Sequence, residues 1–191
     1  AGTSHALATV DPLKFGRTTA PERPPVKPVA DEIIDRTVEY LPRVVADMVR
    51  LQRLTGARSS EVCDMRPCDI DRSGDVWEYR PRRHKTQYRE GHEVKVIPLG
   101  PKAQAILLPY LDRLPELPCF SPRESELERP AEMRRQRKSP VQPSQKSRRK
   151  RRPQRQPGDQ YDRNSYRRAI QRAAKKAGVA EWTPHQIRHT A

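Results

Sequence analysis

Two short stretches of the sequence carry arginines and a histidine at spacings that suit phosphate chemistry. The first is residues 55–58, where Arg58 follows a glycine turn. The second lies near the C-terminal end of the chain and contains His185 and Arg188. A guanidinium can direct two N–H donors at two oxygens of one phosphate, and an imidazole can take up or release a proton near neutral pH. Brought together, the two stretches predict a pocket for a phosphate.

The first stretch is predicted to lie between two helices. Residues 43–54 repeat apolar side chains at helical spacing in a broad stripe, which predicts a deeply buried helix. Gly56 can adopt the left-handed conformation that ends a helix. Ser59 or Ser60 is then expected to cap a short helix that contains Glu61. An arginine at this junction is held more rigidly than a surface arginine, and the alternative interpretation is an arginine that is solvated or caps the core.

The second stretch has the pattern of a helix start. Thr183 offers a hydroxyl for capping, and Pro184 suits the first helical position. His185 and Arg188 are three residues apart, so a helix would project both from one face.

A change of period after residue 75 predicts a small antiparallel sheet. Residues 76–80 and 93–99 alternate apolar and polar side chains in the manner of strands. The connection between them is basic, with Arg82, Arg83 and Lys85. Such a hairpin can lie against a nucleic-acid backbone, and a solubilising loop explains the same residues equally well.

Three further helices complete the predicted domain. They begin near Asp31 and near Pro101, and the third covers residues 161–177. The third carries Arg167 and Arg168 among other basic residues, so it either lies along DNA or is simply solvated. The sequence therefore predicts an α+β fold, a mostly helical domain with a small antiparallel sheet of two or three strands.

Two regions are predicted to lie outside this domain. Residues 1–30 contain five prolines and no sustained periodicity, which is typical of a linker or of the tail of a preceding domain. Residues 122–158 predict a basic disordered or extended insertion, because residues 134–155 hold eleven Lys or Arg and no Asp or Glu. Its densest run is Arg148, Arg149, Lys150, Arg151 and Arg152.

The composition favours a polyanionic partner. The 191 residues carry a net charge of +15 and a pI near 10.3, which is typical of nucleic-acid binding, with an acidic membrane surface as the other option. No apolar run approaches the length of a membrane span, and no signal peptide is apparent. The three cysteines form no CxxC pair, which favours a reducing, cytoplasmic compartment. Neither acidic residues nor histidines cluster at metal-ligand spacing, so no metal or cofactor is expected.

The two stretches, in this order and at this separation, resemble the catalytic domain of the tyrosine recombinases, also called phage integrases. The motifs are Thr-Gly-Ala-Arg-Ser-Ser-Glu at 55–61 and Pro-His-Gln-Ile-Arg-His-Thr at 184–190. The resemblance covers about residues 31–120 and 160–191. It implies site-specific cleavage and rejoining of double-stranded DNA through a 3′-phosphotyrosyl intermediate, without a metal or a nucleotide.

The resemblance also implies roles for single residues. Arg58 and Arg188 would bind the scissile phosphate, and His185 would assist proton transfer. A lysine in the hairpin would protonate the leaving 5′ oxygen. Lys85 is the preferred match, and Lys95 is the alternative.

The same resemblance places the nucleophilic tyrosine after the second motif. The sequence ends at Ala191 before any such tyrosine, so we expect the domain over 31–191 to be partial and inactive alone. Residues 1–30 would be the end of a missing N-terminal DNA-binding domain. The full-length protein is expected to act as a homo-tetramer on DNA.

Two other interpretations of the sequence remain. The chain is either a recombinase domain or a non-catalytic basic protein that binds DNA or RNA through residues 134–155. A ribosomal or other RNA-associated protein is a third possibility that rests on charge alone.

Overall fold

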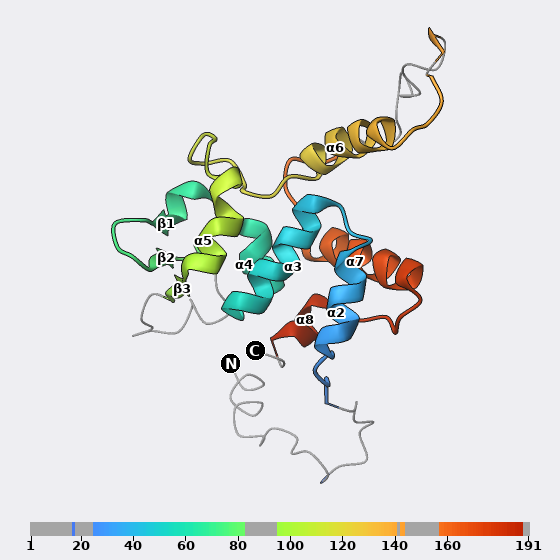
Figure 1. The fold of residues 1–191 in the computed structure, drawn as a ribbon. Coiled ribbons are helices and arrows are strands. Elements are labelled where there is room, and N and C mark those ends of the chain that lie inside the picture. The colour runs from blue at the N-terminus through green and yellow to red at the C-terminus, as the bar shows by residue number, and fades with distance from the viewer. Residues whose placement is uncertain (1–16, 18–24, 83–94, 141, 144–156, 189–191) are drawn as a thin grey trace, which may run out of the picture.

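The computed structural model describes residues 17, 25–82, 95–140, 142–143 and 157–188. This part of the chain is mostly helical, with a small antiparallel sheet at one end (Figure 1), which confirms the predicted α+β fold class. The helices are α2 (Asp31–Val38), α3 (Arg43–Thr55), α4 (Ser59–Asp64), α5 (Pro101–Leu107), α6 (Pro122–Arg135), α7 (Arg163–Ala177) and α8 (Pro184–Ile187), with the short 3-10 helices η1 (Pro67–Asp69) and η2 (Leu108–Tyr110). None of the described helices has the length and apolar character that crossing a membrane requires.

Helix α3 lies at the centre of the fold. It contacts α4, α5, α6, α7 and α8, and most of its side chains are buried, as the broad apolar stripe predicted. Gly56 ends α3 with a positive φ of 60°, and its N–H donates to the carbonyl of Gln52 at 2.9 Å. A residue with a Cβ is strained in this conformation, which explains a glycine between α3 and Arg58.

The sheet has three antiparallel strands in the order β1-β2-β3. They are β1 (Ile70–Asp71), β2 (Trp77–Tyr79) and β3 (Ile97–Leu99). Tyr79 of the central strand pairs with Ile70 on one side and Ile97 on the other, and it is 1% exposed. Its hydroxyl donates to the carbonyl of Glu61 at 2.8 Å, so the sheet is attached to α4.

Helix α7 closes the core against α2 and α4. Its buried side is made of Tyr166, Ile170, Ala173, Ala174 and Ala177. The guanidinium of Arg36 on α2 donates to the carbonyl of Ala177 at 3.1 Å. The indole of Trp182 donates to the hydroxyl of Thr37 at 3.0 Å, inside the core. These bonds tie the C-terminal part of the chain to α2, far away in the sequence.

The prediction that residues 122–158 lack regular structure is wrong for the first part of that segment. Helix α6 spans Pro122–Arg135, with proline at the first helical position. Residues 144–156 lie outside the described residues, so the prediction for the densest basic run stays a prediction.

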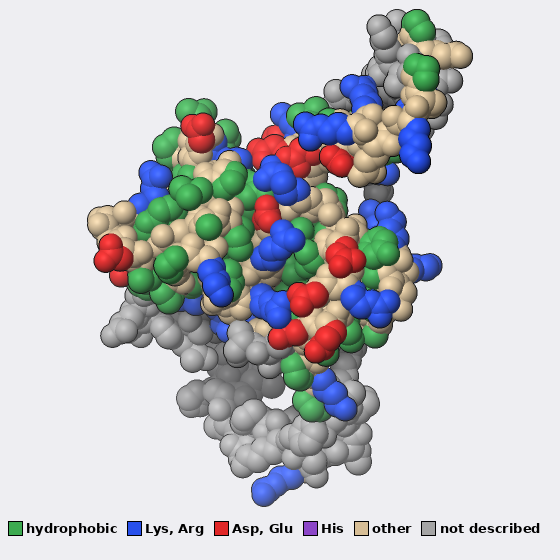
Figure 2. All heavy atoms as spheres, viewed as in Figure 1, with side chains coloured by type: hydrophobic (Ala, Val, Ile, Leu, Met, Phe, Trp, Pro, Cys, Tyr) green, Lys and Arg blue, Asp and Glu red, His purple; other side chains and the backbone are tan. Residues whose placement is uncertain are grey.

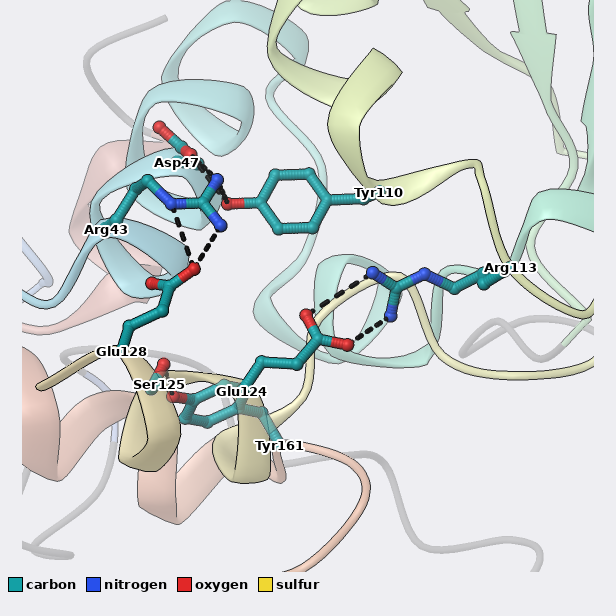
Figure 3. A network of polar contacts seen from close by, with 8 residues as sticks. All are labelled: Arg43, Asp47, Tyr110, Arg113, Glu124, Ser125, Glu128 and Tyr161. Carbon is teal, nitrogen blue, oxygen red and sulfur yellow. Dashed lines mark hydrogen bonds and ion pairs between the residues drawn. The ribbon is translucent and has the colours of Figure 1, made fainter. Parts of the chain in front are cut away.

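Polar contacts with the body of the protein explain why α6 forms without an apolar face (Figure 3). Glu124 accepts a hydrogen bond from the guanidinium of Arg113 at 2.8 Å, and Glu128 is ion-paired with Arg43. The hydroxyl of Ser125 is hydrogen-bonded to that of Tyr161 at 2.8 Å in a buried position. The first two turns of α6 are therefore fixed by contacts that an analysis of apolar periodicity does not detect.

Candidate functional site

Arg58 lies at the junction between α3 and α4. It occupies the N-cap position of α4, so neither of the two serines that follow it caps this helix, contrary to expectation. Its backbone N–H donates to a carboxylate oxygen of Glu61 at 2.7 Å, and its Nη1 donates to the other oxygen at 3.0 Å. About a third of the Arg58 side chain is exposed. The guanidinium is thus anchored on one side and open to solvent on the other.

Glu61 holds a second cation in addition to Arg58. Its side chain is 1% exposed, and Nζ of Lys95 donates to both carboxylate oxygens at 2.7 Å. Burial alone raises the pKa of this carboxyl, but the hydrogen bonds from Lys95 and Arg58 outweigh burial and lower the pKa below its ordinary value. The carboxylate therefore stays charged and positions both cations.

Lys85 lies in the connection between β2 and β3, outside the described residues. The two arms of this connection are described, and both contact Glu61. The hydroxyl of Tyr79 in β2 reaches the carbonyl of Glu61, and Lys95 before β3 reaches its carboxylate. The described residues on the two sides of this connection are therefore attached to Glu61, the residue that holds Arg58.

The second motif forms the short helix α8, as the sequence predicted. Thr183 is its N-cap and Pro184 its first residue, and the N–H of Thr183 donates to the side-chain oxygen of Gln186 at 2.9 Å. Ile187 is fully buried, whereas His185 is exposed. Arg188 is the C-cap and is partly exposed. Both predicted site residues of α8 thus lie on the side that faces away from the core.

Gln52 joins the two motifs. Its buried amide nitrogen donates to the carbonyl of Ala57 at 3.1 Å and to the carbonyl of Pro184 at 2.9 Å. Since Ala57 directly precedes Arg58 and Pro184 begins α8, one side chain brings the two segments side by side. Gln52 was not among the predicted site residues. The sequence signal that could have identified it is a glutamine within the apolar stripe of residues 43–54, which form the most buried helix.

The predicted DNA contacts are spread over the described and the undescribed parts of the chain. Arg82 is ion-paired with Asp69 at 2.6 Å and Glu116 at 2.8 Å, and these hydrogen bonds raise its pKa. Arg167 and Arg168 are exposed on α7. Six predicted residues lie outside the described part: Arg83, Arg148, Arg149, Lys150, Arg151 and Arg152.

Charge is not evenly distributed over the described surface. Figure 2 shows acidic side chains gathered over α2, where the exposed acidic residues are Asp31, Glu32 and Asp35, with Glu39 just beyond the helix. Helix α7 instead exposes six basic residues, Arg163, Arg167, Arg168, Arg172, Lys175 and Lys176. A phosphate backbone is repelled by the first surface and attracted by the second.

Four tyrosines are poorly suited to act as a nucleophile. Tyr79, Tyr110, Tyr161 and Tyr166 are at most 7% exposed, and burial raises the pKa of each hydroxyl. All four hydroxyls also have hydrogen-bond partners. In the described part of the chain, no group of three or more His, Cys, Asp or Glu side chains is arranged to hold a metal ion.

Comparison with known proteins identifies a family and solved structures of similar fold. The sequence pattern of the phage integrase family matches residues 30–191. The crystal structure of XerA recombinase is similar, with a TM-score of 0.44 and 20% sequence identity. The alignment covers 90% of this chain and 51% of the XerA chain, so this chain spans about half the length of that relative. None of the curated proteins matches.

Proposed function

Because this chain belongs to the phage integrase family, we propose that it is part of the catalytic domain of a site-specific recombinase. The reaction is cleavage and rejoining of double-stranded DNA through a 3′-phosphotyrosyl intermediate. The observation that carries the proposal is the shared hydrogen-bond partner of the two motifs. Gln52 fixes the backbone next to Arg58 and the backbone at the start of the helix that leads to Arg188.

In this proposal Arg58 and Arg188 bind the non-bridging oxygens of the scissile phosphate. Phosphoryl transfer places negative charge on these oxygens, and two preorganised guanidiniums neutralise it without a metal ion. Glu61 supports the assignment, because it holds the Arg58 guanidinium in place before DNA arrives. His185, exposed on the same short helix as Arg188, assists proton transfer.

The leaving group receives its proton from Lys85 in this scheme. The tyrosine oxygen attacks phosphorus and loses its proton to His185. The bond between phosphorus and the 5′ oxygen breaks, and the lysine proton goes to that oxygen. The phosphotyrosyl bond conserves the energy of the broken bond, so a 5′ hydroxyl can reverse the step without a nucleotide cofactor. The attachment of both hairpin arms at Glu61 supports a lysine of this connection, with Lys95 as the alternative.

We assign the nucleophile to none of the tyrosines in residues 1–191. In the motif order described above it follows the second arginine, whereas Tyr166 is the last tyrosine of this sequence. Residues 1–191 alone are therefore proposed to bind DNA without forming a covalent intermediate. The full-length protein would act as a homo-tetramer on two duplexes, with residues 1–30 as the connection to an N-terminal DNA-binding domain.

The alternative is a basic protein that binds DNA or RNA and has no catalytic role. The observation in its favour is the row of six exposed Lys and Arg side chains on α7. Such a surface, together with residues 134–155, binds phosphates without reading sequence.

The test separates cleavage from binding in the natural full-length protein. The substrate is a supercoiled plasmid that carries the DNA flanking the coding sequence, and cleavage is read as protein-linked nicked circles. We expect Arg58→Ala and Arg188→Ala each to lower cleavage by at least about 100-fold, as for the loss of one charge-stabilising donor. The affinity for the same duplex is expected to change by no more than about threefold, because most phosphate contacts remain.

Two controls complete the design. Arg72→Ala removes an exposed arginine in the turn before β2, and it is expected to change neither readout. Deletion of residues 134–155 is expected to weaken binding and to make it less dependent on salt. If roughly 6 of the deleted charges contact phosphates, the slope of log affinity against log salt becomes shallower by about 5. Absence of cleavage by the unmodified protein, with binding lost only in the deletion, would overturn the recombinase proposal in favour of the binding protein. Cleavage that survives both arginine substitutions would contradict the roles given to Arg58 and Arg188.

A further inference from the structure

Gln52 makes three buried hydrogen bonds to three separate elements. Its nitrogen donates to the carbonyls of Ala57 and Pro184, and its oxygen accepts from the hydroxyl of Tyr166 on α7 at 3.0 Å. The side chain is 0% exposed. Both N–H groups and one lone pair of the amide are therefore used, and the bond from Tyr166 fixes which end of the amide faces the two carbonyls.

Helix α8 needs such an external anchor. A helix of four residues is not stable by itself in water. At the end of this helix the N–H of Arg188 donates to the carbonyl of His185 at 3.3 Å. From outside the helix, the nitrogen of Gln52 donates to the carbonyl of Pro184 at 2.9 Å, and this bond holds the first residue of α8 against α3. The position of Arg188 relative to the core thus depends on a side chain of α3.

We propose that Gln52 is a positioning residue that sets the spacing between Arg58 and Arg188, so that both guanidiniums bind one phosphate. The inference rests on the proposed function, because it requires the two arginines to share a ligand. Gln52 itself does not reach the phosphate. It acts through the backbone of the two segments that carry the arginines.

The experiment measures how strongly the two arginines depend on each other. Inorganic phosphate is titrated into the chain, and binding is followed by NMR at the Nε–H groups of arginine. A double-mutant cycle with Arg58→Ala and Arg188→Ala gives the coupling between them. Groups that share one ligand are expected to be coupled by about tenfold in affinity.

The same cycle is then repeated in Gln52→Met. Methionine keeps the length and volume of glutamine but offers no N–H donor. We expect the coupling to fall below about twofold while each arginine retains its own contribution to binding. A purely structural role would lower the stability and leave the coupling unchanged.

Two further variants keep the result interpretable. Val45→Ala removes buried volume from α3 far along the helix from Gly56, so it destabilises the fold without touching either motif, and the coupling is expected to survive. Tyr166→Phe removes only the bond that orients the Gln52 amide, and it is expected to weaken the coupling partially. This variant decides the question if Gln52→Met does not fold.

The outcomes distinguish this inference from the proposed function. Absence of coupling in the unmodified chain means that the arginines share no phosphate, which contradicts the proposed function itself. If the unmodified chain shows the coupling and Gln52→Met shows it equally, the role of Gln52 is overturned and the proposed function is not. Tyr166→Phe is judged in the same way if Gln52→Met does not fold.

Discussion

Glu61 determines how Arg58 is presented to a ligand. A buried carboxylate without partners is strongly destabilising, and here Arg58 and Lys95 compensate its charge. In return, the carboxylate restricts two long side chains that would otherwise move freely. Less conformational entropy is then lost when a phosphate binds, so an arginine held in this way binds more tightly than a solvated one.

The lowered pKa of Glu61 predicts a loss of stability in acid. The unfolded chain takes up this proton near the ordinary value of 4.5 and the folded chain only at lower pH. The bonds to Arg58 and Lys95 therefore stabilise the fold above that value and are lost as the pH falls toward the folded pKa. We expect Glu61→Gln to lower the free energy of unfolding by about 2 kcal/mol near neutral pH and to flatten its acid dependence.

Urea unfolding at a series of pH values measures this effect. Glu126→Gln, at an exposed position on α6, is the matched control and is expected to change neither the stability nor its slope with pH. An unchanged acid dependence in Glu61→Gln would show that the carboxylate does not hold the two cations as described.

At the scale of elements, α6 is attached to the core by its first two turns. Glu128 pairs with Arg43, which also donates to the hydroxyl of Tyr110 at 3.1 Å, and that hydroxyl donates to Asp47 at 2.6 Å (Figure 3). Beyond Glu128 the helix is exposed on all sides up to Arg135. The helix therefore connects the core to the basic segment that follows it.

We expect Tyr161→Phe to loosen α6 selectively. The substitution leaves the buried hydroxyl of Ser125 without its partner, which costs about 1–2 kcal/mol. Hydrogen exchange followed by mass spectrometry is expected to accelerate in α6 and to stay unchanged in α3. Leu127→Ala, at a side chain that is 63% exposed on the same helix, serves as the control. Equal exchange of α6 in all three proteins would contradict the proposed attachment.

At the scale of the whole molecule, local patterns predicted most elements and missed what joins them. Periodicity and turn residues correctly predicted the buried helix α3, its end at Gly56, the paired strands β2 and β3, and the start of α8. Strand β1 (Ile70–Asp71) was not predicted, because two residues are too few to show an alternation. Helix α6 was missed because ion pairs with distant residues stabilise it rather than an apolar face. Gln52 was missed because its bond to Pro184 joins residues 132 positions apart, which no local pattern reports.

A crystal structure of the chain bound to duplex DNA would show whether Arg58 and Arg188 share one phosphate. We expect one backbone phosphate within hydrogen-bond distance of both guanidiniums, with Glu61 still bound to Arg58 and Gln52 still joining the two motifs. Arginines that contact different phosphates, or DNA held only by α7 and the basic segment while the two motifs contact no phosphate, would contradict this expectation.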